Sequence, residues 1–236
     1  MKKMLALLCT TAMAFSLVAC GGGSSSSGTT QTTSGAEESA VSGETKKIAY
    51  LTPGLDLPFW RYLANGIENE VIDSGMDATV QVYDSNNSSE TQLQNAQDAI
   101  AKEVDLIIIS PTDSSSCPAV LSAAEEANIP VVIADVGTDS GKYEAFIVTP
   151  NEEGSKELGE FVLQYMEDNN ITGKTAAQIT GSLARNNIKA RFDGFNEALE
   201  AHNVTLEDYQ QMSKFTRAEA EGFAQDLMTT YADLGV

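Results

Sequence analysis

Two adjacent aromatic residues, Phe59 and Trp60, are the side chains best suited to contacting a small ligand. They lie in the segment LTPGLDLPFW, between a short apolar run and a stretch with helical spacing. Pro53, Gly54 and Pro58 interrupt regular structure, so this segment is predicted to be a ligand-facing loop that leads into a helix. An aromatic side chain at such a helix start either contacts a ligand or packs in the core.

Residues that would support catalysis are scarce. The one histidine, His202, is predicted to lie in a polar surface turn, and the chain contains no HExxH, GxSxG or CxxC motif. The tripeptide Gly173-Lys174-Thr175 looks like the end of a phosphate-binding loop. It follows a predicted helix and opens a strand, however, which is the reverse of the order in a true P-loop. We therefore predict a binding protein without a cofactor or metal, not an enzyme.

The first residues indicate export. Two lysines followed by a short apolar run predict a signal peptide over residues 1–19, too short for a transmembrane span. The sequence Leu17-Val18-Ala19-Cys20 resembles the lipobox of bacterial lipoproteins, which implies lipidation of Cys20; a plain signal peptide is the alternative. Residues 20–45 are rich in Gly, Ser and Thr and predict a flexible tether. The folded part would then lie outside the cytoplasm, anchored to the membrane by lipid.

The charge balance argues against a nucleic acid partner. The chain has 34 acidic and 14 basic residues, a formal net charge of −20. Solubility is the simplest reason for such an acidic surface. Cys117 has no intramolecular partner if Cys20 carries lipid, so no disulfide framework is expected. Cys117 is predicted to be a small residue at a helix start.

From residue 46 onward, short β-branched runs alternate with longer stretches at helical spacing. Strands are predicted at residues 47–51, 78–83, 106–109, 131–134 and 145–148, and then at 175–180 and within 204–212. This alternation predicts an α/β fold with doubly wound parallel sheets and helices on both faces. We place a boundary between an N-terminal lobe, 46–149, and a C-terminal lobe, 150–236. The second lobe has fewer strand-helix pairs than the first, so we expect it to be incomplete in this chain.

Two helices of the first lobe have recognisable ends. In the first, Phe59, Leu63, Ile67 and Val71 recur every four residues, and Gly75 is expected to close the helix. The second is expected to open with a capping box. That box is formed by Ser89 and Gln92.

Polar residues follow each of the first four predicted strands. They occur in residues 52–60, 84–86 and 110–113, and at Asp135. Because ligands of parallel α/β sheets bind beyond the carboxyl ends of the strands, this repetition predicts a ligand site at that edge.

Several segments taken together resemble a known family. They are LTPGLDLPFW, VYDSNNS, IIISPTDSS, IPVVIADV and RFDGF, and they are similar to the ribose/galactose-type periplasmic sugar-binding proteins of type 1. The resemblance spans residues 46–217. It implies a two-lobed receptor, a monomer, that closes on a small ligand such as a monosaccharide and delivers it to the permease and ATPase of an ABC importer.

The resemblance also implies roles for individual residues. Phe59 and Trp60 would flank the sugar ring, with the carboxylate of Asp56 beside them. Asp135 would bind sugar hydroxyls, the alternative being a helix cap or a surface residue. Phe215 would pack on the ring, or else belong to the core of the second lobe.

One further position matches a sugar-binding arginine of the family. Lys189 occupies it, with Arg185 and Asn187 in the same loop as alternatives. Val136 and Leu57 replace an arginine and an asparagine of the family pattern, and these losses argue against ribose itself. Another pentose or hexose, a furanose-type sugar or a less polar molecule remains open. The family's other binding residues would lie beyond residue 236.

Other classes of protein share this fold. A ligand-sensing receptor subunit of a signalling or chemotaxis system is the main alternative. A sugar-responsive repressor would need a DNA-binding helix-turn-helix before residue 46, where this sequence has the predicted signal and tether.

Overall fold

A computed structural model describes residues 44–171 and 173–236 of the chain. The predicted signal peptide, Cys20 and nearly all of the predicted tether lie outside these residues. Within the described part of the chain, no helix has the length and apolar character needed to cross a membrane.

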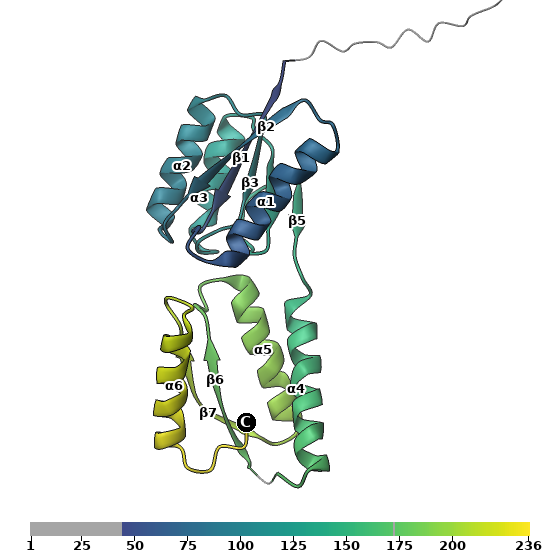
Figure 1. Cartoon of the computed structure of the whole chain (residues 1–236), viewed down its shortest axis with the longest axis vertical. Coiled ribbons are helices and arrows are strands. Elements are labelled where there is room, and N and C mark those ends of the chain that lie inside the picture. The colour runs from purple at the N-terminus through teal and green to yellow at the C-terminus, as the bar shows by residue number, and fades with distance from the viewer. Residues whose placement is uncertain (1–43, 172) are drawn as a thin grey trace, which may run out of the picture. The chain divides into compact units, whose positions relative to one another are not determined.

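The first sheet has five parallel strands in the order β2-β1-β3-β4-β5 (Figure 1). The strands are β1 Lys46–Thr52, β2 Ala78–Asp84, β3 Leu106–Ile109, β4 Val131–Ala134 and β5 Ala145–Ile147. The central strands are apolar on both faces, as in sheets covered by helices on both sides. Leu51, Ile107 and Ile109 are fully buried there. The strands predicted from the sequence are confirmed to within two residues at each end.

Three helices accompany the first sheet. They are α1 Pro58–Asp73, α2 Ser89–Ala101 and α3 Cys117–Glu126. The small residues Ala96, Ala99 and Ala124 let α2 and α3 pack closely on the sheet in one apolar core. Figure 1 shows α1 on the other face. Cys117 begins α3 as predicted, and burial raises the pKa of its thiol to about 11.

The predicted apolar face of α1 is confirmed in part. Val71 is buried, and Leu63 and Ile67 are half-buried. Trp60 and Ala64 beside them are also buried, whereas Phe59 is 53% exposed. A spacing of four residues turns by about 40° per step around a helix of 3.6 residues per turn, so it does not stay on one face. The predicted helix end is confirmed, because Gly75 has φ of +68° just after the last turn.

The predicted capping box of α2 was also wrong. The N-cap is Ser88, one residue earlier, and its side chain accepts a hydrogen bond from the Thr91 amide at 3.2 Å. Gln92 is buried instead. Its Nε2 donates to the Ser110 carbonyl at 2.9 Å and its Oε1 accepts from the Thr112 amide at 3.0 Å. Gln92 therefore fixes the loop that follows β3.

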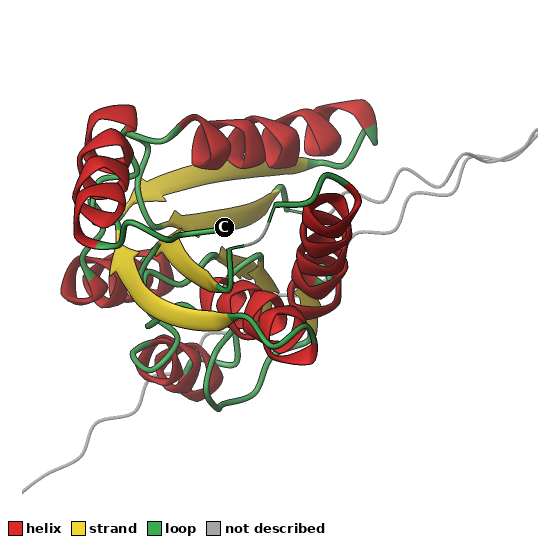
Figure 2. Ribbon diagram, turned by 90° about the horizontal axis from the view of Figure 1, so that it is seen from below, coloured by secondary structure: helices red, strands yellow, loops and turns green. Residues whose placement is uncertain are grey.

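The second sheet is formed by two parallel strands, β6 Thr175–Thr180 and β7 Thr205–Gln211. The last residues pair with β6 on its other side, where Leu234 bridges to Thr175 and the Val236 carbonyl accepts from the Ala177 amide at 3.1 Å. The accompanying helices are α4 Asn151–Asp168, α5 Asn186–Ala201 and α6 Arg217–Thr230. Figures 1 and 2 show helices on both faces of these strands.

Helices α4 and α5 approach each other closely because glycines lie at their contact. A Cβ atom on Gly159 would come within 2.6 Å of the Ala198 Cβ, and one on Gly194 within 2.1 Å of the Glu152 carbonyl oxygen. The α4-α5 pair therefore holds the start of α5 in place, which matters for the site described below.

His202 lies in the turn after α5, as predicted, and is partly exposed. It caps the end of α5, and its Nε2 lies 2.7 Å from a carboxylate oxygen of Glu160 on α4. The hydrogen bond to Glu160, with a second contact to Glu167, raises the pKa of His202. Among residues 44–171 and 173–236, no three His, Cys, Asp or Glu side chains are grouped to hold a metal ion.

The glycine contact gives a testable prediction. Gly194→Ala should lower the free energy of unfolding by about 2 kcal/mol or more, because the new methyl group overlaps the backbone of α4. The matched control is Gly222→Ala in α6, where a Cβ meets no atom within 4 Å. That variant should gain about 0.5–1 kcal/mol from reduced backbone entropy. Urea denaturation measures both, and equal effects would contradict the close α4-α5 packing.

Candidate ligand-binding site

A cavity of about 180 Å³ lies where the carboxyl end of the first sheet meets the start of α5. Its lining residues come from the start of α1, the end of β4, the first turns of α5 and the segment after β7. They are Leu57, Phe59, Trp60, Asp135, Arg185, Asn187, Ile188, Arg191 and Phe215. The wall thus combines apolar and aromatic side chains with a small set of polar groups, as in small-molecule sites generally.

The two aromatics of α1 divide between core and cavity. Their rings pack edge to face, with centroids 4.8 Å apart. Trp60 is only 5% exposed and so belongs to the core as well as to the cavity wall. Phe59 stays largely exposed at the rim. Pro58 begins the helix, a position that suits proline because its fixed φ is already helical.

Asp135 follows β4 in a left-handed backbone conformation, with φ of +67°. Aspartate tolerates this region better than most residues, and the amide of Asp135 donates to the Ile147 carbonyl at 2.8 Å. Its Oδ2 accepts a hydrogen bond from Asn187 Nδ2 at 2.7 Å. Burial raises the pKa of Asp135, and the charges of Arg191 and Arg185 oppose that increase. Partial burial therefore disfavours the ionised carboxylate, while the two nearby arginines favour it.

Arg185 is the N-cap residue of α5 and is buried, with 7% of the residue exposed. Its Nε donates to the Thr112 carbonyl at 3.0 Å and its Nη2 to Asn87 Oδ1 at 2.5 Å. These acceptors lie in the loops after β3 and β2. Burial lowers the pKa of the guanidinium group, and the charge of Asp135 partly offsets this.

Neighbouring backbone groups add to this connection. The Ser114 amide donates to the Ala184 carbonyl at 3.0 Å, and the Asn186 amide donates to Ser114 Oγ at 2.9 Å. Asn186 Nδ2 donates in addition to Asp139 Oδ1 at 3.2 Å. The first turn of α5 is therefore fixed to loops of the first sheet by several hydrogen bonds at once.

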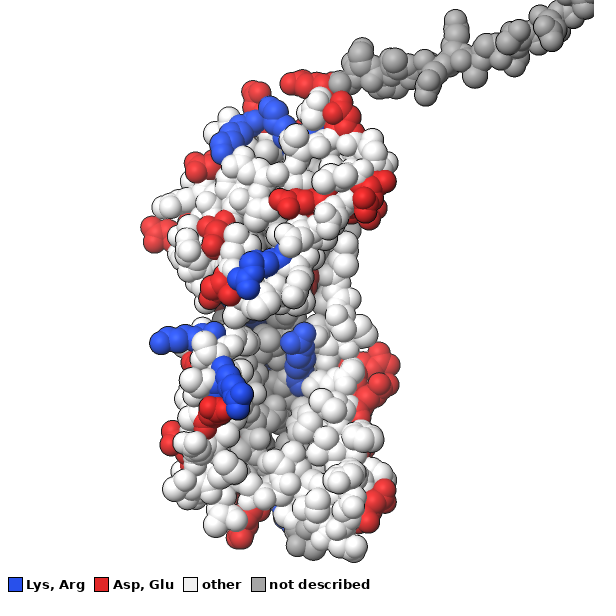
Figure 3. All heavy atoms as spheres, in the orientation of Figure 1, with Lys and Arg blue, Asp and Glu red and all other residues white. Residues whose placement is uncertain are grey.

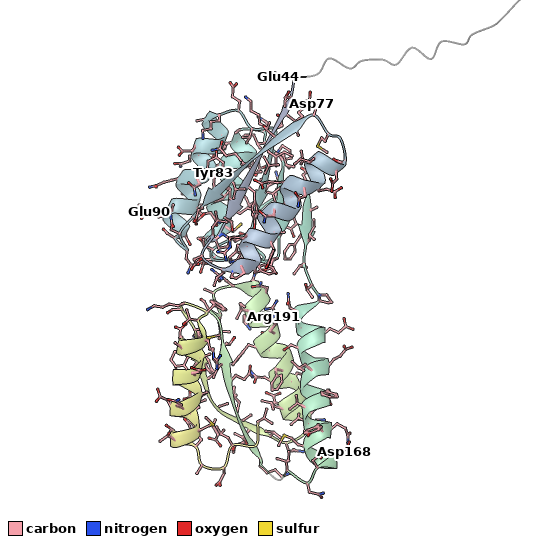
Figure 4. All side chains as sticks on the ribbon, viewed as in Figure 1. Glu44, Asp77, Tyr83, Glu90, Asp168 and Arg191 are labelled. Atoms are coloured by element: carbon pink, nitrogen blue, oxygen red, sulfur yellow. The ribbon has the colours of Figure 1, made fainter. Side chains whose placement is uncertain are left out.

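Arg191 lies one turn further along α5, where Figure 4 labels it. Its Nε donates to Oδ1 of Asn151, the first residue of α4, at 2.7 Å. Sequence reasoning did not assign it to the site, nor did it assign Leu57 or Ile188. The spacing of Asn187, Ile188 and Arg191 on one helix was the available signal, because residues three and four apart share a face.

Most of the predicted site residues line the cavity, but two do not. The carboxylate of Asp56 is exposed and accepts from the Leu57 amide at 3.0 Å. Lys189 is exposed and pairs with Asp193 on its own helix. Phe215 reaches the cavity because Gly181 leaves room for its ring, whose Cζ lies 2.3 Å from where a Cβ of Gly181 would stand.

Residues 48–236 match the family described as periplasmic binding protein domain. The chain belongs to the periplasmic binding protein family. Its relatives and structural neighbours place it with the type 1 proteins of the ribose/galactose kind. This confirms the predicted fold class, an α/β fold with parallel sheets.

This binding protein is similar to several sugar import proteins. It is 28% identical to the ribose import binding protein of Bacillus subtilis, covering 76% of this chain and 56% of the relative. It is 27% identical to the fructose import binding protein FruE of Bifidobacterium longum, covering 98% of this chain and 66% of the relative. A crystal structure of an ABC transporter solute-binding protein from Mycobacterium smegmatis with bound glycerol is 25% identical. It superposes with a TM-score of 0.71 over 81% of this chain and 64% of that chain.

The raised pKa of Asp135 predicts how stability depends on pH. Because the pKa is higher in the folded state than in the unfolded state, the ionised carboxylate lowers the free energy of unfolding. This cost is complete at neutral pH and absent below the unfolded pKa, where the carboxylate is protonated in both states. Asp135→Asn retains an oxygen to accept from Asn187, so it should be more stable than the parent at pH 7. The advantage should shrink as the pH falls through the folded pKa.

Urea denaturation at pH 7 and pH 4 tests this prediction. The matched control is Asp77→Asn, at an exposed aspartate labelled in Figure 4, and it should change stability little at either pH. A less stable Asp135→Asn variant at pH 7 would contradict the proposed cost of the buried carboxylate.

Proposed function

We propose that this protein is an extracytoplasmic solute-binding protein that captures a monosaccharide in the cavity and delivers it to an ABC importer. The observation that carries the proposal is a small cavity whose wall combines the aromatic rings of Phe59 and Trp60 with the polar groups of Asp135, Asn187 and Arg185. Relatives named for ribose and fructose import support the same ligand class.

The chemistry of the wall suits a sugar. A pyranose or furanose ring has C–H faces that pack on aromatic rings and hydroxyl groups that hydrogen-bond to carboxylates, amides and guanidinium groups. The Oδ1 atom of Asn187 is buried and has no donor among the described residues. An acceptor of this kind gains free energy when a hydroxyl reaches it. The volume of about 180 Å³ lies below the roughly 300–1,000 Å³ of drug-sized ligand sites, which favours a small ligand.

We further propose a two-lobed arrangement with an N-terminal membrane anchor. Ligand contacts come from a first lobe, residues 46–149, and a second lobe, residues 150–236, which close on the ligand. A signal peptide over residues 1–19, a lipidated Cys20 and a tether up to residue 45 would anchor a monomer beside the membrane permease and ATPase. We propose Phe59, Trp60, Asp135, Arg185, Asn187 and Phe215 as ligand-binding residues, together with Arg191.

A thermal-shift screen against pentoses, hexoses, nucleosides and amino acids tests the proposal. A ligand that binds only the folded state raises the melting temperature, so we expect a selective increase with one or a few monosaccharides. Phe59→Ala should weaken that binding by roughly tenfold, about 1.4 kcal/mol, with little loss of stability because Phe59 is 53% exposed.

The matched control is Tyr62→Ala, an aromatic of the same helix that is 76% exposed and does not line the cavity. It should leave sugar binding unchanged. Absence of a shift with every sugar, or equal losses in the two variants, would contradict the proposed function.

A further inference from the structure

Two of the four arginines of this acidic chain line the cavity. The sequence contains four, Arg61, Arg185, Arg191 and Arg217, against a net charge of −20. Arg185 and Arg191 line the cavity, and Arg217 lies two residues after Phe215. Arg61 donates to the Leu55 and Asp56 carbonyls, in the loop that leads to the cavity. The other basic residues of the chain are lysines. On the face shown in Figure 3, the lysine and arginine side chains form separate groups and no continuous stripe.

The cavity wall carries more positive than negative charge. Its ionisable lining residues are the guanidinium groups of Arg185 and Arg191 and the carboxylate of Asp135. Two cations and one anion leave a formal surplus of one positive charge.

Neither guanidinium group is neutralised by an ion pair within the described residues. No carboxylate oxygen there lies within 4.0 Å of Arg185 or Arg191. The hydrogen-bond acceptors of Arg185 are the neutral Thr112 carbonyl and Asn87 amide. Arg185 as a whole residue is 7% exposed, and a buried charge without a counterion costs free energy.

Arg191 carries the other guanidinium group of the cavity wall and is exposed, so its terminal nitrogens are accessible to a ligand. Only its Nε is engaged, with Asn151 Oδ1, and this contact fixes the plane of the guanidinium group. Its two terminal nitrogens have no hydrogen-bond partner among residues 44–171 and 173–236. A fork of parallel N–H groups of this kind matches the two oxygens of a carboxylate.

We propose that the preferred ligand is a monosaccharide acid, whose ring packs on Phe59 and Trp60 and whose carboxylate binds Arg191. Asp135 and Asn187 then remain for the hydroxyl groups on the other side of the ring. This inference rests on the proposed sugar-binding function. The negative charge of the whole chain does not prevent it, because salt screens charges over about 8–10 Å while Arg191 meets the ligand directly.

Isothermal titration calorimetry at pH 7 with matched pairs of ligands tests the inference. The pairs are galactose with galacturonate and glucose with glucuronate, which differ at C6 by a hydroxyl or a carboxylate. We expect the acid of at least one pair to bind ten or more times tighter than its neutral partner. Arg191→Gln should remove this preference while the neutral sugar still binds.

The control is Lys189→Gln, which removes a cation from the same helix that does not line the cavity, and it should keep the preference. The inference would be overturned if both acids bound no tighter than their neutral partners, or if the preference for the acid survived in Arg191→Gln. If the neutral sugars bound in either of these outcomes, the proposed function would remain intact. Failure of every sugar and sugar acid to bind would overturn both.

Discussion

The buried side chain of Arg185 is the interaction on which the site depends. Arg185 belongs to the second half of the chain, and its guanidinium group donates to the Thr112 carbonyl and the Asn87 side chain. These acceptors lie in loops that follow two different strands of the first sheet. Hydrogen bonds to a charged group contribute about 1.5–3 kcal/mol each, whereas burying the charge costs several kcal/mol. The net gain is therefore small, and the position of α5 depends also on the contacts of Ser114 and Asn186.

Residues at the cavity are placed at some cost to stability. Asp135 has a left-handed backbone and a partly buried carboxylate, and Arg185 is a buried cation whose pKa burial lowers. Asn187 Oδ1 is buried without a donor among the described residues. Unfavourable features of this kind persist where the surrounding structure holds them, and they concentrate at binding sites. Here the close packing of α4 against α5 and the core of the first sheet supply that support.

The sequence predicted the fold well because β1, β3 and β4 were short apolar runs and the helices longer amphipathic stretches, whereas the polar β7, TLEDYQQ, could be located only within residues 204–212. It predicted the site less completely because residues 181–187 were predicted to be a loop, so the helical spacing that starts at Asn186 was not applied to them. On α5, Lys189 lies about 200° around the helix from Asn187, while Arg191 lies about 40° from it. Lys189 therefore pairs with Asp193 in solvent, and Arg191 lines the cavity. Gln92 was misassigned for a different reason: its partners Ser110 and Thr112 follow another strand, and a local sequence pattern does not show such a contact.

The most direct test uses the intrinsic fluorescence of Trp60, the single tryptophan of the chain, which lines the cavity. Its emission should change saturably when a ligand identified by calorimetry is titrated, with a midpoint that matches the calorimetric affinity. An unaffected emission spectrum at full saturation would contradict the central claim, because the ligand would then bind away from the wall formed by Trp60.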